Sequence, residues 1–273
     1  MFNTDKELIM KKLLLASLMF ASTPLLAHDI NTDACDVDLN AGVKINAAEI
    51  SFTHKGQNLY QIVGRDTLIV DGETVSLNSR QEQLVEEYAS SIRDVVPQVK
   101  TIALDALELA NDGVTLAFNE LLGEGNDIGA ELSNELSNIG EAIDMKLSVE
   151  NGIEFSENGV TGEDLFGEDF EQRFEDSIER AVENSMGSLL IAVGQQLLMS
   201  GGDMEAFETR METFGEQIEY QMETRARAIE DSADELCNAM MEIDALETAL
   251  QDEVDALSEI DVLNVKLSNH DKA

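Results

Sequence analysis

Basic and histidine side chains are scarce in this chain of 273 residues. It has 17 lysines and arginines against 56 aspartates and glutamates, and only three histidines. The formal net charge of −39 repels phosphate backbones and anionic lipids, so we expect no nucleic-acid partner. Such a charge attracts cations and basic proteins. Acidic side chains on exposed helix faces also serve solubility alone, and composition does not separate these two roles.

Catalytic signatures are also missing. Three histidines leave little room for a Ser–His–Asp arrangement, and there is no Walker loop, no GxSxG and no HExxH. Residues 162–176 contain paired carboxylates, but these fall on the polar side of a predicted helix, whereas glycosidases hold two carboxyl groups across a cleft. We predict a protein that is not an enzyme and has no cofactor. An unrecognised hydrolase of envelope polymers is one alternative.

Long apolar runs are absent apart from a short one near the start. Residues 10–27 read MKKLLLASLMFASTPLLA, with two lysines, an apolar core and a small residue at Ala27. This pattern is typical of a secretory signal peptide, and the apolar core is too short to span a membrane. We therefore predict that residues 1–27 form a cleaved signal peptide, with Met10 as an alternative start. No later run reaches the length of a membrane span, so we expect no stable membrane insertion.

Cysteine occurs only twice, at Cys35 and Cys237. An even, small number of cysteines in an exported chain suggests a disulfide bond. The bond would close a loop of 202 residues, the difference between the two positions, and chain entropy then contributes up to about 5 kcal/mol. A reactive thiol pair would need a CxxC spacing or basic neighbours, and neither is present. We predict a structural Cys35–Cys237 bond.

The first part of the mature chain has the two-residue period of β-strands. Apolar and polar residues alternate between 37 and 63, and the clearest hairpin joins 67–70 to 74–77 through Asp71-Gly72. We expect four or five short strands in a β-rich subdomain of residues 28–78.

At residue 78 the period changes to that of a helix. Asn78 or Ser79 is a suitable N-cap, and Glu82 stands three residues after Ser79, as in a capping box. Pro97, the only proline after the predicted signal peptide, should kink this helix. Asn111-Asp112-Gly113 indicates a stop or a bend.

Three further apolar stripes with helical spacing begin at Ile128, Phe166 and Phe207. The last is long enough to approach a coiled-coil-type seam, which can pack within one chain or across a homodimer. Gly201 and Gly202 end the helix before it, as C-terminal glycines commonly do.

These patterns predict an α+β fold. A small N-terminal antiparallel sheet is followed by long amphipathic helices in residues 79–260, which form an elongated hairpin or bundle. Two Asn-Gly pairs in residues 149–160 suggest a short hairpin that docks on the early strands. Residues 261–273 are predicted to be a flexible tail. The predicted disulfide would hold the sheet against the last long helix.

Two sets of residues are candidate metal ligands. Cleavage would make His28 the N-terminal residue, whose amine and ring can bind copper if His54 closes the site. Alternating acids near the start resemble a calcium loop: Asp33, Asp36 and Asp38. The positions that such a loop needs for its glycine and its bidentate acid hold Ala41 and Ala47, and the same acids suit the solvent face of a strand.

Several segments, in the same order along the chain, resemble the YggN-like family, exported proteins of Gram-negative bacteria that contain a domain of unknown function. They include Cys35 with its Asp-rich strand, the hairpin and helix start VDGETVSLNSRQEQLVEEY, and Pro97 in VVPQVK. The segments MGSLL…SGGD and LCNAMMEIDALETALQ, which carries Cys237 and Glu247, complete the set. The resemblance implies a periplasmic protein, and it supplies no catalytic residues.

We therefore expect a soluble periplasmic binding, scaffold or chaperone-like protein. It would contact envelope proteins, preferring basic surfaces, through its helix faces or through the junction of sheet and helices. A periplasmic protein that binds copper or calcium is the second alternative, beside the hydrolase.

Overall fold

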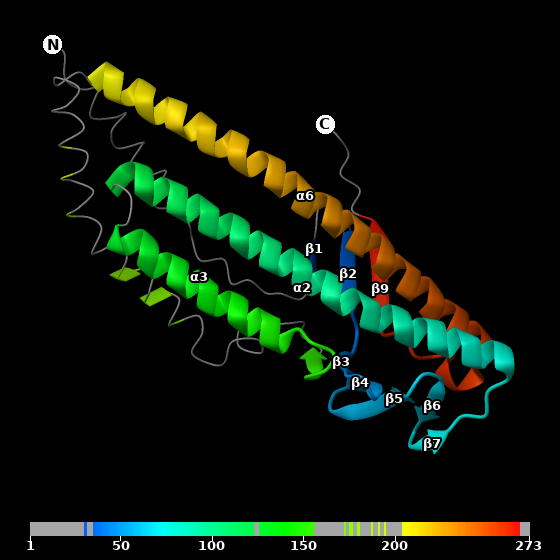
Figure 1. The fold of residues 1–273 in the computed structure, drawn as a ribbon. Coiled ribbons are helices and arrows are strands. Elements are labelled where there is room, and N and C mark those ends of the chain that lie inside the picture. The colour runs from blue at the N-terminus through cyan, green and yellow to red at the C-terminus, as the bar shows by residue number, and fades with distance from the viewer. Residues whose placement is uncertain are drawn as a thin grey trace, which may run out of the picture.

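A computed structural model describes residues 30–31, 35–122, 126–155 and 204–267, together with single positions between 172 and 194. The predicted signal peptide of residues 1–27 lies outside the described residues, as do Gly201 and Gly202. The chain has the predicted α+β architecture, with N-terminal antiparallel strands followed by long helices (Figure 1).

The larger sheet has six strands in the order β7-β6-β5-β4-β3-β8. Their bounds are β3 Gly42–Ile45, β4 Glu49–His54, β5 Gln57–Val63, β6 Thr67–Val70, β7 Glu73–Thr74 and β8 Ile153–Phe155. The predicted hairpin is confirmed, because β6 pairs with β7 through Asp71-Gly72, and both turn residues have positive φ angles, of 51° and 79°. Alternate residues of β3 to β6 point into the core.

Strand β8 comes from the segment in which the sequence predicts a second hairpin. It pairs with β3 from Ile45↔Ile153 to Val43↔Phe155, so this part docks on the early strands as expected. Residues 156–160, the other half of the predicted hairpin, lie outside the described residues.

The smaller sheet joins segments from near the start and near the end of the described chain. Its order is β1-β2-β9, with bounds Ile30–Asn31, Cys35–Leu39 and Leu263–Leu267. The antiparallel register runs from Cys35↔Leu267 to Leu39↔Leu263. The predicted flexible tail is therefore wrong for residues 261–267, because Val262 and Leu263 are buried in the core. Residues 268–273 lie outside the described part.

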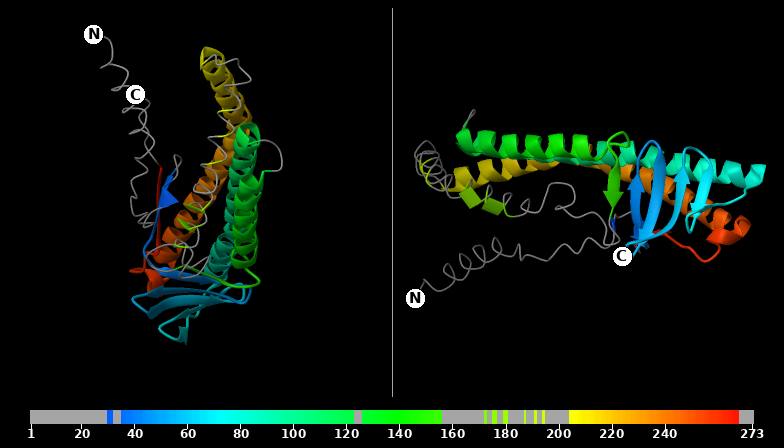
Figure 2. Two further views of the ribbon diagram at one scale, coloured as in Figure 1. Left: turned by 90° about the vertical axis from the view of Figure 1, so that its left-hand side faces the viewer. Right: turned by 90° about the horizontal axis from the view of Figure 1, so that it is seen from below.

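Three long helices, α2 (Ser79–Leu122), α3 (Asp127–Lys146) and α6 (Met204–Glu253), lie beside one another, and α2 contacts both others (Figures 1 and 2). A short 3-10 helix, η1 (Asp255–Leu257), follows α6. Within the described part of the chain, none of the helices is apolar over a stretch long enough to cross a bilayer. The coiled-coil-type seam and the homodimer stay predictions.

Helix α2 is continuous through Pro97, where the sequence predicts a kink, and through residues 111–113, where it predicts a stop or a bend. It continues through Pro97, whose carbonyl accepts a hydrogen bond from the Thr101 hydroxyl at 2.9 Å, and the kink there stays a prediction. The helix does not stop at Asn111-Asp112-Gly113. Tertiary contacts with α6 hold it there: Asp112 pairs with Arg225, and a Cβ on Gly113 would lie 3.8 Å from the sulfur of Met222.

The N-cap of α2 is Asn78 rather than Ser79. The Asn78 side chain accepts from the N–H groups of Arg80 (2.9 Å) and Gln81 (3.1 Å), and Gln81 accepts in return from the Asn78 N–H at 2.9 Å. This is a capping box with Gln81, not Glu82, as its second member.

We expect Asn78→Ala to lower the free energy of unfolding by about 1 kcal/mol, because two N–H groups at the helix start lose their acceptor. The matched control Ser79→Ala should have a much smaller effect. Urea unfolding of the two variants measures both changes, and equal losses would contradict this assignment of the cap.

The hydrophobic core occupies one end of the molecule. We call this end the head: the two sheets with residues 79–97, 143–155 and 237–267. The arm comprises residues 98–122, 126–142 and 204–236. Every buried hydrophobic side chain of the described chain belongs to the head. The arm therefore extends beyond the core, and its described hydrophobic side chains all keep part of their surface accessible.

Candidate functional site

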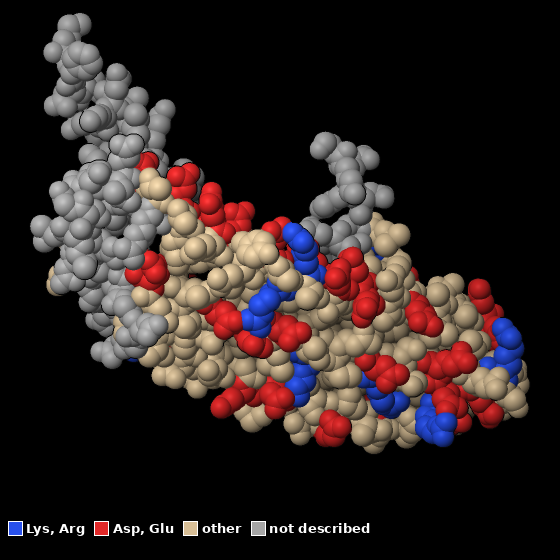
Figure 3. All heavy atoms as spheres, turned by 45° about the horizontal axis from the view of Figure 1, so that its top comes forward, with Lys and Arg blue, Asp and Glu red and all other residues tan. Residues whose placement is uncertain are grey.

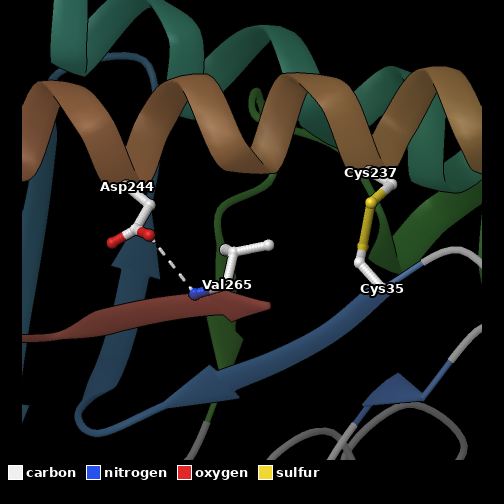
Figure 4. Close-up of a disulfide and its surroundings, with 4 residues drawn as sticks. All are labelled: Cys35, Cys237, Asp244 and Val265. Atoms are coloured by element: carbon white, nitrogen blue, oxygen red, sulfur yellow. Dashed lines mark hydrogen bonds between the residues drawn. A yellow bond between two sulfur atoms is a disulfide. The ribbon is translucent and has the colours of Figure 1, made fainter. Parts of the chain in front are cut away.

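The predicted disulfide bond is present and attaches the smaller sheet to the last helix. Cys35 begins β2 and Cys237 lies in α6, with their Cα atoms 6.0 Å apart (Figure 4). Both residues are almost completely buried, at 2% and 3% of their surface exposed. The bond therefore lies inside the head and does not offer a thiol pair to solvent.

Two acidic side chains farther along α6 accept hydrogen bonds from the backbone at β9, the edge strand of the smaller sheet. Asp244 accepts from the Val265 N–H at 3.4 Å (Figure 4). Glu247 accepts from the N–H groups of Val262 at 2.6 Å and Leu263 at 3.0 Å. Because β2 pairs with the opposite edge of β9, these carboxylates take the place of a neighbouring strand at its outer edge.

Glu247 is almost entirely buried, with 3% of its surface exposed. Burial raises its pKa to about 7, the hydrogen bonds from Val262 and Leu263 act in the opposite direction, and the nearby charges of Asp261 and Asp244 raise it further. A carboxyl group with this pKa changes its protonation close to neutral pH.

Two buried tyrosines lie near the same carboxyl group. The hydroxyl groups of Tyr60, in β5, and Tyr88, in α2, are 3.1 Å apart, so one donates a hydrogen bond to the other. Burial raises the pKa of both phenols well above 10, and the charge of Glu247 adds to this effect. Phe52 stacks on Tyr60 with ring centroids 4.3 Å apart. These contacts join the larger sheet to α2 and α6.

The surface of the head has a pocket that Glu247, Tyr60 and Tyr88 do not line. It has a volume of about 380 Å³ and lies between β5, the β6–β7 turn and the segment around η1. Its lining includes apolar Leu59, Val70 and Ile260 and acidic Asp71, Asp255 and Glu259. Glu247 is not among its lining residues, so the carboxyl with the raised pKa is not placed to act on a molecule bound there.

Three basic side chains of the arm pair with acids on the long helices. Arg225 of α6 pairs with Glu108 at 2.9 Å and with Asp112, both on α2. Lys100 of α2 pairs with Asp144 of α3 at 2.6 Å. Arg227 pairs with an acid on its own helix, Glu223. These positive charges are therefore neutralised within the molecule.

A row of exposed acids runs along the part of α6 that belongs to the arm. We call Glu208, Glu212, Glu216 and Glu219 the α6 acidic row; all four are exposed. Spacings of four, four and three residues place them on one face of the helix. Figure 3 shows acidic side chains spread along the visible face of arm and head, with the basic ones beside them. Like charges at this spacing destabilise an isolated helix, so helix formation does not explain the row.

The residues predicted to bind metal are not brought together in the described chain. His28 and Asp33 lie outside it. His54 ends β4 in the larger sheet, whereas Asp36 and Asp38 belong to β2 in the smaller one.

Asp38 instead pairs with Lys266 of β9 at 3.5 Å, and Asp36 has one buried oxygen, Oδ1, without a hydrogen bond. Within the ranges that the structure describes, no three His, Cys, Asp or Glu side chains are grouped so that they could hold a metal ion. The copper and calcium sites stay predictions.

Sequence reasoning did not find the role of Glu247. Its signal was present, because Glu247 stands four residues after Ile243 and three before Leu250, both buried. An acid at that spacing lies on the apolar stripe of the helix. The spacing does not show which backbone N–H groups donate hydrogen bonds to this carboxylate.

Comparison with family models matched residues 35–263 to a family described as "Protein of unknown function (DUF2884)". Searches of curated proteins and of solved structures found no match. The matched range begins at Cys35 of the disulfide and ends at Leu263, which donates to Glu247. The chain therefore belongs to the DUF2884 family of proteins of unknown function.

Proposed function

We propose that this protein is a periplasmic, non-enzymatic binding protein of the YggN-like type, whose acidic arm contacts basic surfaces of other envelope proteins. The observation that carries the proposal is the exposed α6 acidic row on a helix that extends beyond the core. A row that opposes helix stability and contributes nothing to the core fits a role in binding.

The charge distribution of the arm supports a basic partner. Helix α6 contains 15 acidic and three basic residues, and two of those three, Arg225 and Arg227, are paired within the molecule. The negative field therefore faces outward, where it speeds encounter with positive surfaces and repels negative ones. The same row on a second copy would be repelled, so this face suits a basic partner better than a copy of itself.

The proposed location agrees with the chemistry of the head. Disulfide bonds persist in oxidising compartments such as the periplasm and are rare in the cytosol. The Cys35–Cys237 bond is buried and joins two distant segments inside the core, as a permanent structural disulfide does. It therefore fits a protein of an oxidising compartment. Together with the predicted signal peptide, it supports export.

Two variants with equal changes in charge test the proposal. The arm variant changes the α6 acidic row to glutamine. The head variant changes four exposed acids of the head to their amides: Asp66, Glu73, Asp255 and Glu259. Binding of a lysine-rich fluorescent peptide is measured by anisotropy, with a glutamate-rich peptide of equal length as the negative probe.

We expect the full chain to bind the lysine-rich peptide and to lose that binding steeply between about 50 and about 300 mM NaCl. The arm variant should bind about tenfold more weakly, and the head variant much less so. Equal losses in both variants would mean that net charge alone attracts the peptide. Binding that does not respond to salt would contradict the proposal directly.

A further inference from the structure

Tyr220 lies on the arm part of α6 with 75% of its surface exposed, more than any other large hydrophobic side chain that the structure describes. The other two tyrosines of the chain, Tyr60 and Tyr88, are buried in the head. In the described chain the Tyr220 ring contacts no other aromatic ring, and its hydroxyl forms no hydrogen bond. Neither core packing nor helix propensity, which is modest for tyrosine, accounts for an aromatic side chain here.

The position of Tyr220 continues the α6 acidic row. It follows Glu216 by four residues, the spacing that also separates Glu208, Glu212 and Glu216. Side chains of an α-helix lean toward its N-terminus, so the ring is directed toward the turn that carries Glu216. Met222, which contacts α2 at Gly113, comes two residues later, or about 200° around the helix. The ring therefore points away from α2 and lies beside the exposed carboxylates of the row.

The basic residues that follow Tyr220 on α6 are engaged elsewhere. Arg225 forms ion pairs with two acids of α2, and Arg227 pairs with Glu223. Within the ranges that the structure describes, no lysine or arginine stacks on the Tyr220 ring, and Glu216 has no ion pair. An exposed ring beside a carboxylate without a counter-ion can attract a cation through the face of the ring and through the negative charge together.

We propose that Tyr220 makes the arm select arginine over lysine in its basic partners: an arginine guanidinium stacks on the Tyr220 ring while Glu216 accepts its N–H groups. The inference rests on the proposed function, because it names the basic side chain that the α6 acidic row receives. The occupant follows from charge complementarity, since a negative face repels an acidic partner and a second copy of itself.

The choice of arginine follows from the shapes of the two cations. A guanidinium is planar and weakly hydrated, and its N–H donors lie in its own plane. It can therefore stack on a ring and donate to a neighbouring carboxylate at the same time. The ammonium of lysine is a compact and strongly hydrated charge, so it gains less from the face of the ring. Tyrosine and arginine are also among the residues that contribute most at protein interfaces.

Two fluorescent peptides of equal length and charge test the proposal on the full, disulfide-bonded chain. One peptide has arginine as its only basic residue and the other has lysine, and anisotropy gives both dissociation constants at about 50 mM NaCl. We expect the unsubstituted protein to bind the arginine peptide more tightly. Tyr220→Leu keeps an apolar side chain but removes the ring, so it should reduce the ratio of the two constants by about two- to fivefold. Part of the ratio persists, because carboxylates themselves favour guanidinium.

Two control variants accompany this measurement. Tyr220→Phe keeps the ring and should keep the ratio. Met145→Ala removes an apolar side chain of α3 that is 61% exposed, and it should also leave the ratio unchanged. A ratio in Tyr220→Leu equal to that of the unsubstituted protein would overturn the inference, as would an equal loss of affinity for both peptides. Either result leaves salt-sensitive binding of the lysine peptide, and with it the proposed function, in place. Failure of both peptides to bind would overturn both proposals.

Discussion

Removal of the Cys35–Cys237 bond is expected to lower the melting temperature of this protein by about 10–20 °C. The bond joins residues separated by 202 positions in the chain, and closing a loop of that length removes up to about 5 kcal/mol of conformational entropy from the unfolded state. For a chain of this size each kcal/mol corresponds to about 2–4 °C. The bond also fixes β2 to α6. Without it, the smaller sheet stays attached through Asp244, through Glu247 and through the buried side chain of Leu263.

The measurement compares thermal unfolding of the oxidised protein with that of a variant carrying Cys35→Ala and Cys237→Ala. Addition of a reductant should lower the melting temperature of the first and leave the second unchanged. The denatured mass of protein recovered from the periplasm should be that of a chain beginning at His28 and lacking two hydrogens. Equal melting temperatures for the oxidised protein and the variant would show that the bond contributes little to stability.

Tyr88→Ala is expected to lower the free energy of unfolding by about 3–5 kcal/mol, as is usual when a large buried aromatic side chain is truncated. Tyr88 has only 1% of its surface exposed, and its ring lies 6.2 Å from that of Phe52 between their centroids. Truncation would leave a cavity where α2 meets the larger sheet. It would also deprive the buried hydroxyl of Tyr60 of its hydrogen-bond partner.

Tyr220→Ala is the matched control, because Tyr220 lies on the arm portion of α6 with 75% of its surface exposed. It should change the free energy of unfolding by less than about 0.5 kcal/mol. Tyr88→Phe separates the hydroxyl from the ring and should cost about 1 kcal/mol. Urea unfolding of the three variants gives these values, and similar losses for Tyr88→Ala and Tyr220→Ala would contradict the division into head and arm.

Features that depend on neighbouring residues could be predicted from the sequence. The turn at Asp71-Gly72 requires positive φ angles that this residue pair tolerates, so the hairpin was visible without a structure. The start of α2 follows from the capping residues around position 78, although the choice between Asn78 and Ser79 needed the observed hydrogen bonds. The disulfide was predictable because only one pairing of two cysteines exists.

Features that join distant segments could not be predicted in the same way. Residues 263–267 alternate like many exposed segments, and only their pairing with β2 shows that they form a strand. Glu247 occupies an apolar stripe, but the stripe does not say that a strand from the C-terminal end will meet it. Helix α2 continues through Asn111-Asp112-Gly113, where the sequence predicts a stop or a bend. The residues that contact it there, Met222 and Arg225, lie more than 100 positions away in the chain.

The sequence by itself determined the α+β class, the positions of the hairpin and of the long helices, the pairing of the cysteines and the strong negative charge. These depend on local backbone preferences, on periodicity and on composition, which act over a few residues or over the chain as a whole. Only the tertiary structure decided that β9 closes the smaller sheet and that Glu247 is buried against it. It also decided that Lys100, Arg225 and Arg227 form ion pairs within the molecule while the α6 acidic row stays exposed. Those outcomes depend on which segments, far apart in the chain, pack together and remove each other's side chains from water. A local sequence pattern does not contain that information.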